Sequence, residues 1–205
     1  MTNIDEAEAA RHREKMKKRK EVQDAEVASK AIAEKGLLIV HTGKGKGKTT
    51  AAFGLALRTL GYGRTVGVVQ FVKGAWHTGE RDAFAAFGDR VRWHSMGEGF
   101  TWETQDLKRD VAAAEAAWIQ AKALMADPEV ALLVLDEINI ALRYDYLSLA
   151  DVVETLRGRR EGLHVVATGR NAKPELIEAA DLVTEFEAVK HHFAAGVKAQ
   201  EGIEF

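Results

Sequence analysis

Residues 37–57 read LLIVHTGKGKGKTTAAFGLAL, and this stretch decides the fold. An apolar run leads directly into a loop of glycine and lysine, and a helical pattern starts immediately after that loop. Glycines let successive backbone amides turn inward without side-chain collisions, and the N-terminus of the helix adds a partial positive charge. The order of strand, glycine loop and helix therefore predicts a loop that binds phosphate groups.

The loop residues that we expect to contact a nucleotide are Thr42, Gly43, Lys44, Gly45, Lys46, Gly47, Lys48, Thr49 and Thr50. Lys48 should reach a phosphate oxygen, and Thr49 carries the hydroxyl expected to bind magnesium. Gly43 and Gly47 enclose three residues where the usual loop has four, so Thr42 stands where the first glycine belongs. Because a shorter loop offers fewer amides to the phosphates, the spacing predicts a nucleotide pose unlike that in ordinary hydrolases.

The composition excludes several other kinds of protein. With 205 residues, 46% of them apolar, the chain fits one ordinary domain with a buried core. It contains no cysteine, which excludes disulfides, zinc–thiolate sites, iron–sulfur clusters and thiol nucleophiles. A formal net charge of -2 gives no global attraction to nucleic acid or to anionic membranes. The apolar run at 130–135 is far shorter than the ~20 residues that span a bilayer, so we expect a cytoplasmic protein.

Residues 1–35 differ from the rest of the chain. They contain no aromatic residue, and the run RHREKMKKRK at 11–20 carries seven Lys or Arg against one Glu. This composition predicts a charged N-terminal helical arm exposed to solvent. Two alternatives are an arm that folds over the active site or a second subunit, and an arm that binds nucleic acid. The last lacks the interleaved aromatic residues of single-strand binders.

From residue 36 to 205, short β-rich runs alternate with longer helical patterns. The predicted strands are residues 37–41, 65–71, 91–94, 130–135, 164–168 and 182–186, and the main predicted helices are 49–60 and 106–126. In the second helix an apolar stripe runs from Leu107 through Trp118, so Trp118 should lie in the core, and Asp106 should cap the helix. These features predict an α/β fold of the P-loop NTPase-like class, with a mostly parallel sheet and helices on both faces.

Two acidic residues follow the predicted fourth strand. The run VALLVLDE at 130–137 places Asp136 and Glu137 where P-loop folds hold their metal, directly or through water. One of them should serve the Mg²⁺ or Mn²⁺ that accompanies ATP; in a hydrolase Glu137 would instead polarise an attacking water. Arg170, in VVATGR after the fifth strand, leaves the sheet on the same side and is a further candidate for phosphate binding. Helix capping by the acids and a plain surface position for Arg170 are the structural alternatives.

The stretch GEGFTWETQD at 97–106 places Phe100 and Trp102 in a glycine-flanked polar loop. Neither residue belongs to a helical or an alternating apolar pattern, so the sequence period does not require their burial. On composition alone, both would form a small local core under the loop.

These segments together resemble the P-loop corrinoid adenosyltransferases, the ATP:cob(I)alamin and cob(I)yrinic acid a,c-diamide adenosyltransferase family. The resemblance covers residues 36–205 and is carried by TGKGKGKTTAAFG, GFTWETQ, VLDE, YDYL, TGR and VKHHFAAGVKAQEGIEF. The charged extension before residue 36 is similar to that of the longer, aerobic-pathway members. In this family the short loop goes with ATP bound in the reverse sense to hydrolases. Lys44 departs from the pattern, since the family often has Asn there.

The resemblance implies that the 5′-deoxyadenosyl group of ATP passes to the reduced cobalt of a corrinoid, with release of triphosphate, in adenosylcobalamin biosynthesis. Lys48 and Thr49 would contact the triphosphate and the metal, and Glu137 would be the acidic metal ligand. Phe100 and Trp102 would close beneath the corrin ring and displace its lower axial ligand. The catalytic residues would thus be Lys48, Glu137, Phe100 and Trp102.

The resemblance also implies partners: an external reductant, a reduced flavin or flavoprotein, and a second copy of the chain in a homodimer. Because a fixed axial ligand would oppose reduction of cobalt, we expect structural or phosphate-facing roles for the candidate histidines His41, His94, His191 and His192. Two other classes remain open. One is a P-loop ATPase or kinase acting on another substrate, and the other is a non-catalytic module that senses ATP or binds nucleic acid.

Overall fold

The computed structural model describes residues 5–30, 35–72, 78–96 and 106–204. The chain divides into two compact units, Met1–Lys35 and Gly36–Phe205. The first unit contains the helix α1 (Glu6–Ala28), which begins where Asp5 accepts a hydrogen bond from the amide of Ala7. No residue of α1 is buried, and oppositely charged side chains pair one turn apart, as Lys20 does with Asp24 at 2.8 Å. Such pairs add a few tenths of a kcal/mol each, about 0.2–0.5, to an exposed helix.

In the described part of the second unit, six strands form one sheet in the order β3-β2-β4-β5-β1-β6, and every neighbouring pair is parallel. The strands are β1 (Leu38–Thr42), β2 (Thr65–Gln70), β3 (Val91–Ser95), β4 (Val130–Asp136), β5 (His164–Thr168) and β6 (Leu182–Glu185). All six predicted strands are confirmed with small shifts at their ends. Since the strands are parallel, their carboxyl ends share one edge of the sheet, where the phosphate loop also lies.

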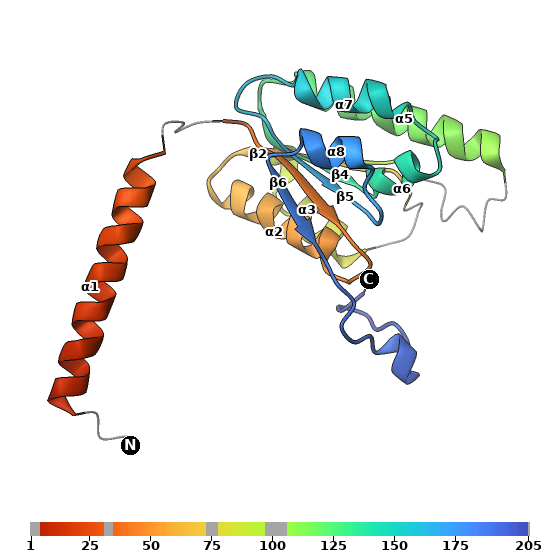
Figure 1. Cartoon of the computed structure of the whole chain (residues 1–205). Coiled ribbons are helices and arrows are strands. Elements are labelled where there is room, and N and C mark those ends of the chain that lie inside the picture. Colours follow the sequence, from red (N-terminus) through yellow and green to blue (C-terminus); the bar gives the residue numbers. More distant parts are fainter. Residues whose placement is uncertain (1–4, 31–34, 73–77, 97–105, 205) are drawn as a thin grey trace. The chain divides into compact units, whose positions relative to one another are not determined.

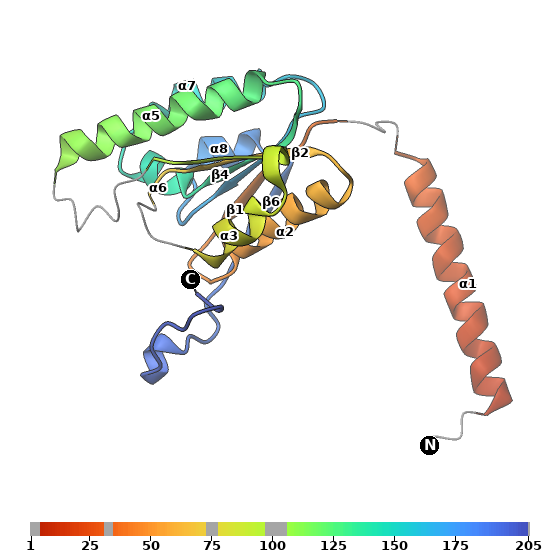
Figure 2. The same ribbon diagram turned by 180° about the vertical axis from the view of Figure 1, so that it is seen from behind.

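Helices cover both faces of the sheet, which confirms the predicted α/β class (Figure 1). On one face lie α2 (Lys48–Gly61) and α3 (Gly79–Ala85); on the other lie α5 (Leu107–Ala126), α6 (Ile138–Arg143), α7 (Leu149–Arg157) and α8 (Pro174–Ala179), as the reverse view in Figure 2 also shows. Side chains along a strand point to alternate faces. Leu133 and Leu135 therefore join the core under α5, whereas Leu132 and Val134 join the core under α2. No helix of the described residues is long and apolar enough to cross a membrane.

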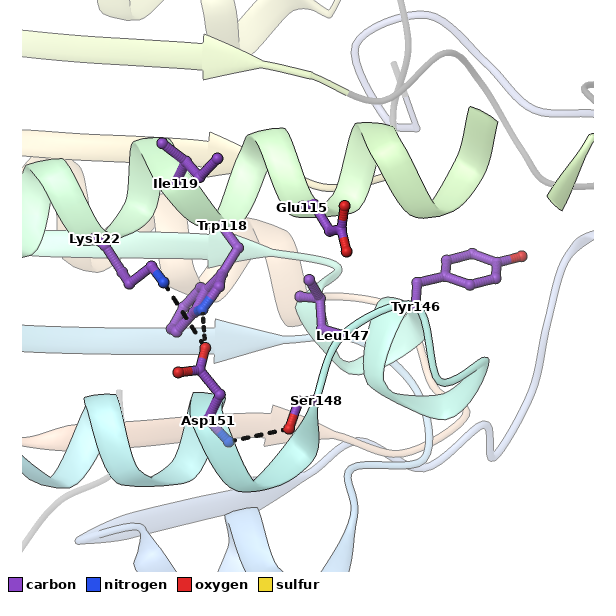
Figure 3. A pocket seen from close by; sticks show the side chains of 8 residues that line it. All are labelled: Glu115, Trp118, Ile119, Lys122, Tyr146, Leu147, Ser148 and Asp151. Carbon is purple, nitrogen blue, oxygen red and sulfur yellow. Dashed lines mark hydrogen bonds and ion pairs between the residues drawn. The ribbon is translucent and has the colours of Figure 1, made fainter. Parts of the chain in front are cut away.

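Trp118 on α5 lies in the core, as predicted, with 4% of its surface exposed. Figure 3 shows its indole Nε1 donating a 2.7 Å hydrogen bond to Asp151 of α7, at the side of a pocket of about 340 Å³. The predicted cap is also confirmed, because Asp106 accepts hydrogen bonds from two amides of the first turn. The prediction that Leu107 belongs to the buried stripe is wrong: it is 65% exposed. The buried residues of α5 begin only at Ala114, so the first turns contribute nothing to the core.

His164 at the start of β5 makes the fold sensitive to acid. Its Nδ1 accepts a 3.1 Å hydrogen bond from the amide of Leu37, so this nitrogen carries no proton. Burial lowers the pKa of His164, and the nearby charges of Arg64 and Arg159 lower it further. The unfolded chain therefore takes up this proton first as the pH falls. The stabilisation is present above the ordinary histidine pKa, about 6.5, and is lost as the pH drops toward the folded value.

We therefore expect the free energy of unfolding to decrease between pH 7.5 and pH 5.5. His164→Gln should decrease less over this range, because the amide oxygen keeps an acceptor for Leu37 without titrating. Urea unfolding at several pH values measures both. Equal pH dependence in the two proteins would contradict this account of His164.

Candidate active site

The phosphate loop folds around the ammonium group of Lys48. The Lys48 side chain is buried, and its Nζ donates to the carbonyl oxygens of Gly43 at 2.9 Å and Gly45 at 2.5 Å. Burial lowers the pKa of Lys48; the charge of Glu137 raises it, and those of Arg170 and Lys46 lower it. Arg170 and Lys46, the other cations predicted to bind phosphate, thus lie close enough to Lys48 to influence its charge.

The chain that leaves β6 packs directly against the loop. The Gly45 amide donates to the carbonyl of Phe186 at 2.6 Å, and the Phe186 amide donates to the carbonyl of Thr42 at 2.9 Å. A Cβ atom at Gly43 would lie 2.5 Å from the Phe186 oxygen, and one at Gly45 would lie 2.5 Å from the Glu187 oxygen. Gly43 and Gly45 are therefore needed for this close approach, and the Gly45 amide already has an acceptor.

A carboxylate from the C-terminal segment reaches a second loop lysine. Glu204 binds Lys46 Nζ through Oε2 at 2.8 Å and lies 3.0 Å from His192 Nε2 through Oε1. The hydrogen bond from Lys46 lowers the pKa of Glu204. A pocket of about 470 Å³ opens between the loop and the chain after β6, lined in part by Thr42, Lys44 and Phe186. An anion entering the loop therefore meets Lys46 already paired with a carboxylate.

Asp136 at the end of β4 joins the loop to the sheet. The residue is fully buried, and its Oδ1 accepts from the hydroxyls of Thr49 at 2.8 Å and Thr168 at 2.9 Å. Its Oδ2 accepts from Nε2 of the Gln70 side chain at 3.1 Å. Asp136 thus holds the Thr49 hydroxyl in place.

Glu137, the next residue, is placed differently. Its backbone has a φ of 62°, in the left-handed region, and its amide donates to the Thr168 hydroxyl at 3.0 Å. A non-glycine residue in a disfavoured backbone region costs on the order of 1–3 kcal/mol and persists where the surroundings enforce it. Gly169 makes room for the side chain, because a Cβ there would lie 3.0 Å from Glu137 Oε2. Glu137 is only half-buried, and the negative charge of its carboxylate raises the pKa of Lys48.

The structure brings together most of the predicted site. The stretch from Thr42 to Thr50, the two acids and Arg170 all lie at the carboxyl ends of β1, β4 and β5. Thr42 uses its hydroxyl to accept from the Ala172 amide at 3.0 Å, whereas Lys44, Thr50 and Arg170 are exposed. Phe100 and Trp102 lie outside the described residues.

His41 was expected from the sequence to have a structural or phosphate-facing role, whereas Asn139, Gln70 and Thr168 escaped prediction from the sequence. His41 Nδ1 lies 3.2 Å from the Lys48 carbonyl, its ring meets Phe186 edge-on at 5.4 Å, and burial lowers its pKa. Asn139 is fully buried and donates to the Gly169 carbonyl at 3.0 Å. The sequence offers one usable signal: Gln70, Thr168 and Asp136 each stand at, or next to, the end of a predicted strand.

The sheet, the glycine loop and the acids after β4 define a nucleotide-binding protein of the P-loop class. Comparisons with known proteins narrow this class. A family model described as "ATP:corrinoid adenosyltransferase BtuR/CobO/CobP" matches residues 34–205, and another, "Cob(I)alamin adenosyltransferase N terminal", matches residues 1–27. The chain belongs to the ATP:corrinoid adenosyltransferase family.

Curated relatives match over nearly the whole chain. A corrinoid adenosyltransferase of Pseudomonas aeruginosa is 56% identical, covering 95% of this chain and 96% of its own. The corrinoid adenosyltransferase CobA of Salmonella typhimurium is 47% identical, covering 95% and 98%. Among solved structures, the RadB recombinase covers 77% of each chain with a TM-score of 0.43 and 13% identity, a likeness that carries no information on activity. The resemblance inferred from the sequence motifs is confirmed.

The close contact between the loop and the chain after β6 predicts that Gly45→Ala is costly. The added Cβ cannot fit beside the Glu187 carbonyl, so one of the two segments must move, at about 1–3 kcal/mol for an overpacked position. We expect lower stability in urea unfolding together with weaker ATP binding. Gly54→Ala on α2 is the control: nothing lies within 4 Å of its Cβ, and alanine in a helix should stabilise by roughly 0.5–1 kcal/mol. Unchanged ATP affinity in Gly45→Ala would show that the contact does not shape the loop.

Proposed function

We propose that this protein transfers the 5′-deoxyadenosyl group of ATP to the reduced cobalt of a corrinoid, releasing triphosphate, in the biosynthesis of adenosylcobalamin. The observation that carries the proposal is the 56% identity to a corrinoid adenosyltransferase over 95% of the chain. The site supports it, since a phosphate loop and two acids stand at one edge of the sheet. The separation of Met1–Lys35 from the rest supports an N-terminal arm distinct from the catalytic domain.

The cations of the loop bind the triphosphate. Lys48 is the central one: its buried ammonium already contacts two oxygens of the loop and has phosphate as a stronger alternative. Lys46 and Arg170 add positive charge nearby. These groups stabilise the negative charge that develops on the leaving triphosphate, which is the contribution that such fixed charges make to catalysis.

The oxygen atoms around Lys48 suit a hard divalent cation. Thr49 and Glu137 would hold Mg²⁺ or Mn²⁺, because a hydroxyl and a carboxylate are ligands that these ions prefer. Asp136 is fully buried and accepts three hydrogen bonds, so its role is to orient Thr49. The bound ion would neutralise charge on the triphosphate.

The reaction needs no nucleophile from the protein. The lone pair of Co(I) attacks the 5′ carbon of the ribose, a cobalt–carbon bond forms, and the carbon–oxygen bond to triphosphate breaks with its electron pair leaving on oxygen. A chain without cysteine can support this chemistry. The protein orients the two substrates, neutralises the leaving group and excludes water.

Three further parts of the proposal rest on the resemblance. Phe100 and Trp102 contact the corrinoid and displace its lower ligand, which eases reduction of Co(II). A reduced flavin or flavoprotein supplies that electron. The active protein is a homodimer.

The decisive experiment identifies the products. Purified protein with MgATP and a chemically reduced corrinoid should give inorganic triphosphate and a light-sensitive cobalt–carbon bond in equal amounts. Lys48→Ala and Thr49→Ala should each lower the rate by on the order of 10² to 10³, the loss typical of one removed stabilising contact. Lys122→Ala on α5 serves as the control with normal activity. Formation of ADP without cobalt alkylation would favour the alternatives instead, with free phosphate released by an ATPase and a phosphorylated substrate formed by a kinase.

The aromatic residues should matter for one step only. Phe100→Ala and Trp102→Ala should impair adenosylation that starts from cob(II)alamin and a flavin reductant, while ATP affinity stays normal. Chemically pre-reduced cob(I)alamin should restore much of the activity, because it bypasses the assisted reduction. A role in a local core predicts instead a loss of about 3–5 kcal/mol in stability for each truncated ring. Thermal unfolding measured beside both activities distinguishes the two.

A further inference from the structure

A chain of hydrogen bonds leaves Asp136 on the side away from the phosphate loop. Gln70, at the end of β2, donates from Nε2 to Asp136 Oδ2 at 3.1 Å. Ser95, at the end of β3, donates from Oγ to Gln70 Oε1 at 2.8 Å, and Trp93 donates from Nε1 to Ser95 Oγ at 2.9 Å. The parallel register sets these residues side by side, since Gln70 pairs with both Ser95 and Asp136. None of the roles proposed above uses Gln70, Ser95 or Trp93.

The direction of this chain is fixed by chemistry. An indole N–H only donates, so Ser95 must accept from Trp93 and turn its own proton toward Gln70. The Gln70 amide must then present its oxygen to Ser95 and its nitrogen to Asp136. A side-chain amide has two orientations that are otherwise hard to tell apart, and here the indole at the far end selects one. The selected orientation is the one that supplies a donor to the carboxylate.

The ring of Trp93, at the far end of this hydrogen-bond network, also packs against α2. The Trp93 ring packs against Phe53, with ring centroids 5.3 Å apart, and against Phe84 of α3 at 5.9 Å. Phe53 stands four residues after Thr49 on α2, and residues four apart share a helix face. The same helix therefore meets this network at both ends, through the Thr49 hydroxyl at Asp136 and through the Phe53 ring at Trp93.

We propose that Trp93, Ser95 and Gln70 are positioning residues for the metal and triphosphate site. Gln70 and the two threonines hold opposite oxygens of Asp136, so the carboxylate cannot rotate about its terminal torsion, which is otherwise soft. The fixed Oδ1 directs the Thr49 proton, which leaves the lone pairs of the Thr49 oxygen for the ion. The inference rests on the proposed assignment of metal and triphosphate to this loop.

The test measures binding of MnATP by calorimetry, without a corrinoid. Gln70→Leu keeps a similar shape but removes the donor, and its affinity should fall about tenfold or more, as for other residues that orient metal ligands. Ser95→Ala should lose less, and Trp93→Phe least, because each lies one hydrogen bond further from Asp136. Ser95→Thr, which keeps the hydroxyl, should bind almost as the wild type does.

Trp118→Phe is a matched control. It also removes an indole N–H that donates a hydrogen bond to a neighbouring side chain, that of Asp151 (Figure 3). Trp118, however, packs on the opposite face of the sheet from Trp93. Both tryptophan variants should lose some stability in urea, and only Trp93→Phe should bind MnATP more weakly. Normal affinity in Gln70→Leu and Ser95→Ala would overturn the inference while leaving the proposed function intact. Failure of the wild type to bind MnATP would overturn both.

Discussion

The hydrogen bond between Thr49 and Asp136 is the interaction on which the site depends. It joins the first turn of α2 to the end of β4 across 87 residues of sequence, at a distance of 2.8 Å. Because Thr49 directly follows Lys48, the same hydrogen bond also holds the backbone of Lys48 in position at the end of the loop. The hydroxyl of Thr168 and the amide of Gln70 secure the carboxylate from two further strands. The start of α2, where the phosphate loop ends, is thus anchored through Asp136 to three strands of the sheet.

Several donors of the loop already form hydrogen bonds or ion pairs with groups of the same chain. Lys48 binds loop carbonyls, Lys46 binds Glu204, and the Gly45 amide binds the Phe186 carbonyl. These contacts satisfy donors that a nucleotide phosphate would otherwise attract. In the proposed function, ATP that binds at this loop must replace these hydrogen bonds, so the net gain in free energy is smaller than the number of phosphate contacts suggests.

The sequence was informative wherever the argument needed only local pattern. Glycine spacing located the loop, apolar runs located the strands, and Asp136 and Glu137 followed from their place at a strand end. The network of Gln70 and Ser95 could not be predicted in this way. It depends on β2 lying between β3 and β4, and strand order comes from tertiary packing, which periodicity does not encode. The prediction for Leu107 was wrong for a related reason: an apolar stripe does not show where along a helix its contact with the sheet ends.

The position of β1 has a consequence for how the protein folds. Although β1 is the first strand in the sequence, it pairs with β5 and β6, and the amide of Leu38 donates to Asp181, 143 residues later. Contacts this distant in sequence form slowly, because the intervening chain must first be closed into a loop. On the ribosome, the glycine loop emerges well before the later strands that support it. The ability to bind nucleotide should therefore be among the last properties that the nascent domain acquires.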